Sequence, residues 1–245
     1  MPAAAALRRS SARTAPAGRA GERSDDVPTS RVVASELVLH RVVRRELRLL
    51  AELSTWALAD DADRTRDLTR HADLIARLLL HHHAVERELL WPALLRAAPS
   101  AGPRVERWTA RVAGLDSRLR GLSTAARQWA VAASDKARDA FALACLDLAD
   151  AVDAQTAEEE RELLPLLAAH LTSAAWAEVT RAARCPLSRR ERSLVLGLAL
   201  EDACAADRAR LLAGLPASTR LAWRLVGRRR HRATVVRLRG APPAR

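Results

Sequence analysis

His82 and Glu86 lie four residues apart within residues 67–98, a segment in which apolar side chains recur at spacings of three and four. That spacing predicts a helix on which both side chains face the buried side. An imidazole or a carboxylate loses its hydration when it is buried, so it needs a hydrogen-bonding partner or a metal ion. The pair therefore indicates either a metal site or a buried polar network.

Two other predicted helices carry polar residues of the same kinds on their apolar faces. His40 lies in the middle of the apolar stripe of residues 30–59. Gln155 and Glu159 are four residues apart in the stripe that begins after Ser134. Glu159, like the carboxylate of the first segment, is followed by a proline six residues later, so the two segments are weak echoes of one another.

Four long amphipathic helices would position these residues. The expected helices run from Ser30 to about Ala59, onward from the polar turn at residues 60–65, over about residues 104–129, and onward from a cap at Ser134. Short connections make neighbouring helices antiparallel. Abundant Ala and Leu with few Gly favour helices over strands. We therefore predict an all-α fold, an up-down-up-down four-helix bundle with additional C-terminal helices packed on it.

Two segments resemble a known family. HHHAVERELLWPALL, residues 81–95, and AQTAEEERELLPLLAAHLTSAAW, residues 154–176, look like the two carboxylate-bearing helices of the hemerythrin-like, or HHE cation-binding, domain. The resemblance covers roughly residues 31–183 and continues more loosely to about residue 230. It implies a four-helix bundle. It also implies a pair of non-haem irons, with histidines from all four helices and two carboxylates that bridge the metals.

Position by position, the resemblance implies four metal ligands in this chain: His40, His82, Glu86 and Glu159. Other ligands of the family are missing. Arg111 and Val112 stand where the third helix of the family carries its Gln-His pair, and Trp108 stands in place of a further histidine. Gln155 replaces the histidine of the fourth helix. The chain thus keeps the half-site for one iron and lacks the other half.

Two imidazoles and two carboxylates can hold a single Fe(II), Mn(II) or Zn(II) ion with positions left open for a small ligand. The resemblance implies iron, with one ion expected rather than two, and a role in binding or sensing oxygen, nitric oxide or peroxide. In the alternative interpretation the metal is lost, the carboxylates pair with the histidines, and the bundle is a scaffold for protein–protein interaction. The residues alone leave both interpretations open.

The rest of the chain divides by composition. We expect a disordered leader over residues 1–29, the bundle over 30–184, a helical extension over 185–228 and a flexible basic tail over 229–245. The extension has too little apolar mass for a domain of its own, so its helices are expected to pack on the bundle or on another subunit. His231, in the tail, is expected to lie on the surface.

Positive charge is concentrated near the C-terminus. The formal net charge is +12, and residues 224–245, with eight Arg and no Asp or Glu, supply +8 of it. A nearly neutral body with a basic tail differs from a nucleic-acid binder whose Arg residues are spread over a folded face. The Arg residues from 228 to 239 could contact nucleic acid or anionic lipid, although we favour the simpler interpretation of a solvated terminus.

Other functional classes are not expected. The chain has no nucleophile elbow, phosphate-binding glycine loop or dinucleotide fingerprint, so we do not predict an enzyme. No apolar run is long enough to span a membrane. The first residues lack the apolar core of a signal peptide, so we predict a cytoplasmic protein. The three cysteines are far apart, with no CxxC spacing, so they predict neither disulfides nor a thiolate metal site.

Overall fold

The computed structural model describes residues 26–240, with side chains from residue 33 onward, and all regular structure in that range is helical. The bundle helices are α1 (Asp26–Thr55), α2 (Ala62–Val85), its continuations η1 (Glu86–Leu90) and α3 (Trp91–Ala97), α4 (Gly102–Ala132) and α5 (Asp135–His170). The other elements are η2 (Pro99–Ala101), α6 (Ser173–Ala182), α7 (Arg189–Glu201), α8 (Ala205–Ala213), α9 (Ala217–Ala222), η3 (Trp223–Gly227) and α10 (Arg228–Arg239). The leader predicted over residues 1–29 lies outside the described residues, except that 26–29 begin α1.

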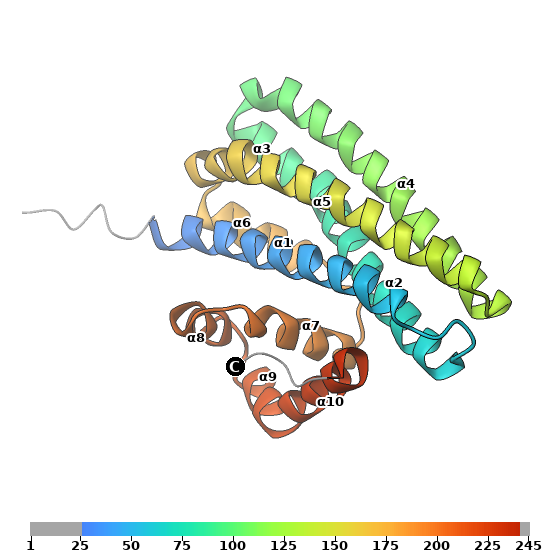
Figure 1. Ribbon diagram of the computed structural model, residues 1–245. Helices are drawn as coiled ribbons and strands as arrows, with labels where there is room; N and C mark the ends of the chain where they lie inside the picture. The colour runs from blue at the N-terminus through green and yellow to red at the C-terminus, as the bar shows by residue number, and fades with distance from the viewer. Residues whose placement is uncertain (1–25, 241–245) are drawn as a thin grey trace, which may run out of the picture.

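The predicted all-α bundle is confirmed. Helix α1 contacts α2 and α5, and α4 contacts the same two helices, so the four close around a common core (Figure 1). Helix α6 packs near one end of the bundle, whereas α7 to α10 lie together on the side of α1 away from α4 (Figure 1). None of the described helices is long and apolar enough to cross a lipid bilayer.

Side-chain caps fix where several helices begin. The Asp61 carboxylate accepts a hydrogen bond from the Arg64 backbone N–H at the start of α2. Ser134 caps α5 and Thr172 caps α6 in the same way, and Ser188 forms a capping box at the start of α7. Such caps satisfy backbone N–H groups that have no partner within the helix. The cap predicted from the sequence at Ser134 is therefore confirmed.

The bundle core consists of two apolar clusters separated by a layer of mostly polar groups. The first cluster, toward the loop between α1 and α2, includes Leu47, Leu68, Leu119, Trp129 and Phe141. The second, toward α6, includes Leu90, Trp91, Leu94, Trp108 and Leu163. The groups between the clusters, which we call the polar layer, are Glu36, His40, His82, Glu86, Gln155 and Glu159. The bundle thus holds its ionisable groups in a sheltered position midway along the core.

The backbone of the second bundle helix changes its pitch at the polar layer. Pro92 has no N–H to donate to the carbonyl of Glu88. The N–H of Trp91 donates to the carbonyl of Glu86, five residues earlier, which makes the π-helical turn η1. The disturbance of the helix at this proline is therefore one wide turn, after which the helix continues as α3. Such turns often occur at functional sites.

The C-terminal helices correct two predictions. The flexible tail predicted over residues 229–245 is wrong for residues 229–239, which form most of α10. The prediction that His231 lies on the surface is also wrong, because its ring is buried against the backbone of Gly197, where no Cβ would fit. Val235 and Leu238 are buried on the same helix, so α10 has an inward face despite its many Arg residues.

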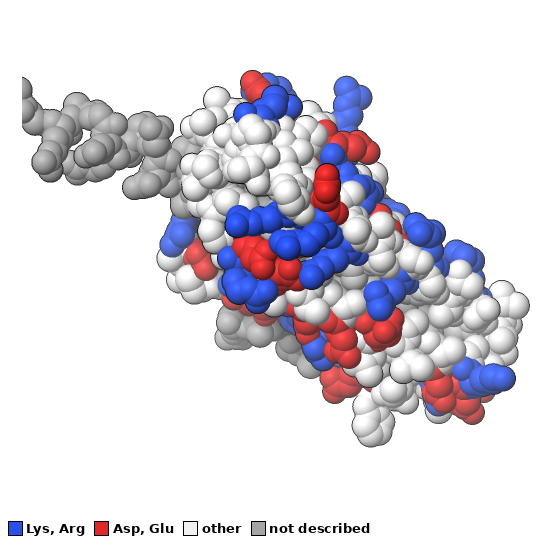
Figure 2. All heavy atoms as spheres, turned by 90° about the horizontal axis from the view of Figure 1, so that it is seen from above, with Lys and Arg blue, Asp and Glu red and all other residues white. Residues whose placement is uncertain are grey.

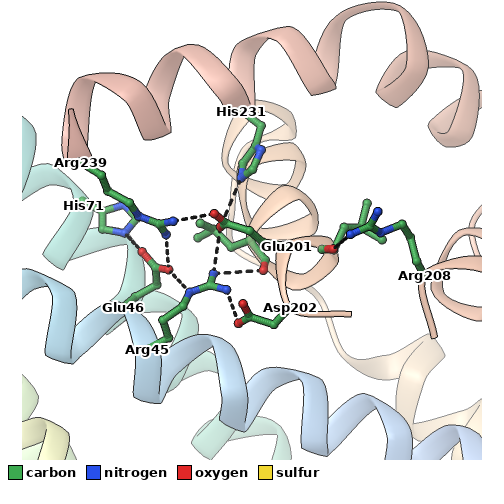
Figure 3. Close-up of polar contacts among 10 residues, drawn as sticks. Arg45, Glu46, His71, Glu201, Asp202, Arg208, His231 and Arg239 are labelled. Carbon is green, nitrogen blue, oxygen red and sulfur yellow. Dashed lines mark hydrogen bonds and ion pairs between the residues drawn. The ribbon is translucent and has the colours of Figure 1, made fainter. Parts of the chain in front are cut away.

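A buried ion-pair network joins α7 and α10 to the bundle (Figure 3). The Glu46 carboxylate accepts hydrogen bonds from Arg45 Nε at 2.7 Å and from Arg239 Nη2 at 2.7 Å. The other Glu46 oxygen lies 2.8 Å from His71 Nε2. Arg239 also donates to Glu201 at 2.6 Å, so one guanidinium spans a carboxylate of α1 and a carboxylate of α7. The C-terminal helices are therefore held by charge pairing as well as by apolar contact.

Candidate metal centre

The four residues predicted as ligands come together in the polar layer. His40 lies in the middle of α1, His82 in the last turn of α2, Glu86 at the first position of η1 and Glu159 in α5. His40 Nε2 is 3.3 Å from Glu159 Oε2, and His82 Nε2 is 3.4 Å from Glu86 Oε1. One donor atom from each of His82, Glu86 and Glu159 lies within 4.8 Å of the other two. Three bundle helices thus supply donors to one small volume.

Glu36 is a further donor that the sequence analysis missed. Its carboxylate lies 3.6 Å from His82 Nδ1, and donor atoms of Glu36, His40 and His82 lie within 4.8 Å of one another. The His82 ring therefore lies between two carboxylates, one at each ring nitrogen. A signal was present in the sequence, because a residue four positions before His40 falls on nearly the same face of the helix.

Polar groups behind His40 fix the orientation of its ring. Its Nδ1 lies 3.0 Å from Glu160 Oε1, and Arg44 Nη1 lies 3.1 Å from the same oxygen. Arg44 Nε donates to Thr156 Oγ1 at 2.6 Å. A metal-binding histidine commonly uses its second ring nitrogen in such a hydrogen bond. The arrangement directs His40 Nε2 toward Glu159 and the rest of the polar layer.

The side of the bundle formed by α4 supplies no donor to the layer. Val112 is fully buried there, and Trp108 is buried and stacked on Trp91 with ring centroids 5.6 Å apart. Gln155 does lie in the layer, but its amide Nε2 donates to Glu159 Oε1 at 2.6 Å. The predicted loss of the second half-site corresponds to the buried apolar side chains of α4 and to Gln155, whose amide is already hydrogen-bonded to Glu159.

The remaining histidines of the bundle have partners outside the layer. His83 Nδ1 lies 2.6 Å from Asp116 Oδ1, a buried contact between α2 and α4, and Arg87 donates to the other oxygen of the same carboxylate at 2.9 Å. His71 belongs to the network that contains Glu46. Neither histidine is therefore a candidate ligand.

Burial controls the protonation of the layer. Burial raises the pKa of Glu36 to about 7, against the opposing charge of His40 and with the added repulsion of Glu159. The pKa of Glu86 is raised well above its ordinary value by burial and then by Glu159 and Glu36. The pKa of His82 is lowered well below its ordinary value, again first by burial and then by neighbouring histidines. When the carboxylates of the polar layer are ionised, too little positive charge lies close to them to balance their negative charge.

His40 is the exception among the histidines of the layer. Burial acts to lower its pKa, but the hydrogen bond and the charge of Glu159, with help from Glu36 and Glu160, outweigh burial and raise it. One protonated imidazole would still face several carboxylates. Glu86 Oε2, moreover, is buried with no hydrogen-bond partner. A buried carboxylate oxygen without a partner is costly, and a cation bound beside it would remove that cost.

The donor set fits a divalent transition metal. Imidazole nitrogens and carboxylate oxygens together suit Fe(II), Mn(II) and Zn(II). A bundle with such groups projecting inward from facing helices is the architecture of the metal-binding four-helix proteins.

The comparison with protein families agrees with this class. Residues 37–167 match the family model described as the hemerythrin HHE cation binding domain, a match over more than half of the chain. The chain therefore belongs to the hemerythrin HHE cation-binding family, which confirms the resemblance and implies that it binds a metal cation. Curated proteins and solved structures give no match.

Proposed function

We propose that this protein binds one non-haem iron ion in the polar layer and uses it to bind or sense oxygen, nitric oxide or peroxide. The proposed ligands are His40, His82, Glu86 and Glu159. The observation that carries the proposal is the partnerless buried oxygen of Glu86, which lies among imidazole and carboxylate donors from three helices. We propose a binding role in the cytoplasm rather than catalysis.

One ion is favoured over two because of where the donors lie. Glu36, His40 and His82 form one group, and His82 is shared with the group that contains Glu86 and Glu159. A second ion would need ligands on the α4 side, where Val112 offers none. Gln155, which lies in the polar layer, carries an amide, which is a poor iron ligand.

The residues around the site would exclude water and hold the ligands in place. The two apolar clusters cover the layer from both ends of the bundle. Glu160 holds the His40 ring, and the raised pKa of Glu36 gives this carboxyl group a proton to hold or release near neutral pH. Iron bound here would supply an open coordination position for a small ligand.

The alternative of a metal-free scaffold accounts for part of the geometry. The contacts of His40 with Glu159 and of His82 with Glu86 would be ion pairs in such a network. They leave Glu86 Oε2 without a partner, and the lowered pKa of His82 disfavours the charged imidazole that the pair with Glu86 would need. We therefore favour the metal-bound interpretation.

Titration of nitric oxide into protein that has been loaded anaerobically with Fe(II) tests the proposed sensing role. We expect a change in visible absorption that saturates at about one nitric oxide per iron, because the iron held by these residues would take the small ligand at an open position. The His82→Ala variant should show no change, whereas His81→Ala, at the half-buried neighbouring position outside the layer, should behave like the wild type. Loaded iron without any absorption change would contradict the sensing role and leave metal binding as a separate result.

A further inference from the structure

Helices α9, η3 and α10 form one continuous helical run from residue 217 to residue 239. Its inward face is defined by the buried residues Trp223, Gly227, His231, Val235 and Leu238. Gly227 has no room for a Cβ, because the Trp223 ring and the Ser193 hydroxyl lie against it, so this face is closely packed on α7. The opposite face of the run points away from α7, at the edge of the molecule (Figure 1).

The charge on this outer face is of one sign. From Arg208 to Gly240 the chain has ten Arg and no Asp or Glu. On the helical run from residue 217 to residue 239, five exposed Arg form no ion pair with a described residue: Arg224, Arg228, Arg229, Arg230 and Arg232. The bundle is different, because Figure 2 shows positive and negative groups side by side on its surface. One such ion pair joins Arg118 of α4 to Asp147 of α5.

Aliphatic side chains are exposed among these Arg residues. Leu221 and Leu225 are 56% and 62% exposed, and Val226 and Val236 are 44% and 39% exposed. Single exposed apolar residues are ordinary on a protein surface. Here four exposed apolar residues lie on one helical run that also carries five unpaired Arg. Together they form an amphipathic basic surface rather than isolated apolar positions.

We propose that this surface, the outer face of α9, η3 and α10, binds an anionic lipid bilayer. The unpaired Arg residues would contact the lipid phosphates, and the exposed leucines and valines would enter the boundary between headgroups and acyl chains. A single-stranded nucleic acid would call for exposed aromatic side chains, but Trp223 is buried. A second copy of this face would bring like charges together. The proposal is independent of the metal site, which lies in the bundle.

Sedimentation with lipid vesicles tests the proposal on the full-length chain. We expect binding to vesicles that contain phosphatidylglycerol, no binding to pure phosphatidylcholine vesicles, and weaker binding in high salt. Removing the charges of Arg228, Arg229 and Arg232 by substitution with Ala should weaken the affinity by about a hundredfold, because each Arg near an anionic surface contributes about fivefold. The double variant Leu221→Ser, Leu225→Ser should lose the binding that remains in high salt.

A matched control removes the same charge elsewhere. Arg96, Arg104 and Arg120 are exposed on α3 and α4 and form no ion pair with a described residue, so their substitution by Ala should leave vesicle affinity within about twofold. The proposal is overturned if the wild type ignores anionic vesicles or if the control weakens binding as much. Binding of double-stranded DNA without vesicle binding would also overturn it, as would a wild-type dimer that the leucine variant dissociates. The comparison of anionic with neutral vesicles uses the wild-type protein, so it tests the proposal even if a variant is misfolded.

Discussion

Glu36 and His40 repeat on α1 the four-residue spacing that His82 and Glu86 have on α2. The two pairs face each other, so that the His82 ring contacts Glu36 at one nitrogen and Glu86 at the other. In the proposed centre Glu36 is either a fifth ligand or the group that orients His82. In both roles its negative charge favours a bound cation.

Glu36→Gln tests that role because it keeps the shape of the side chain and removes its charge. We expect the affinity for Fe(II) to fall about 10- to 100-fold, the effect usual for loss of a group that supports a metal ligand. The exposed Glu88→Gln on η1 is the matched control and should leave the affinity unchanged. Equal Fe(II) affinities for Glu36→Gln and the wild type, measured by competition with a chelator, would remove Glu36 from the site.

Residue patterns in the sequence predicted much of the site, because helical spacing decides which side chains share a face. His40, His82, Glu86 and Glu159 were placed on inward faces, and the structure brings them into one layer. Glu36 could not be assigned from the sequence because it lies outside the motif that carries the family resemblance, and a carboxylate near the start of a helix is ordinarily solvated. Only the approach of α2 shows that it faces His82.

At the scale of elements, the sequence predicted helices and caps well and irregular turns poorly. Ser134 caps a helix as expected, because capping is a local interaction between neighbouring residues. The π-helical turn at Glu86 was not predicted. Pro92 indicates a disturbed helix, but whether the chain bends, stops or widens by one residue depends on what the neighbouring helices pack against it.

Residues 229–239, near the C-terminus, also differ from the prediction because their contacts are not local in sequence. A run of Arg residues looks solvated in the sequence, yet α10 is a helix with Val235 and Leu238 buried and Arg239 paired to two carboxylates. These partners, Glu46 on α1 and Glu201 on α7, lie far away in sequence. No local pattern could have revealed them.

For the molecule as a whole, the ion-pair network around Glu46 joins the C-terminal helices to the bundle. Burial alone would raise the pKa of Glu46. The hydrogen bond and charge of His71 and the charges of Arg239 and Arg45 outweigh burial and lower it to about 2. The ordinary value is 4.5. The ionised carboxylate therefore stabilises the folded state above pH 4.5, and this contribution is lost as the pH falls through 2.

Urea unfolding of Glu46→Gln as a function of pH checks this assignment. The variant should be less stable than the wild type by on the order of 3 kcal/mol near neutral pH, since each unit of pKa shift corresponds to about 1.4 kcal/mol. The difference should shrink as the pH falls below 4.5 and become small near 2. Glu52→Gln, at an exposed position of the same helix, should show no such difference. A constant difference across this pH range would mean that the charge of Glu46 is not what stabilises the interface.

Elemental analysis of the protein purified from iron-supplemented cells tests the central claim most directly. We predict about one iron atom per chain in the wild type, and little iron in His82→Ala and Glu86→Gln, because each variant removes a proposed ligand. Glu88→Gln serves again as the exposed control and should retain its iron. Iron at background level in the wild type would contradict the metal centre and favour the metal-free scaffold. About two atoms per chain would contradict the surviving half-site.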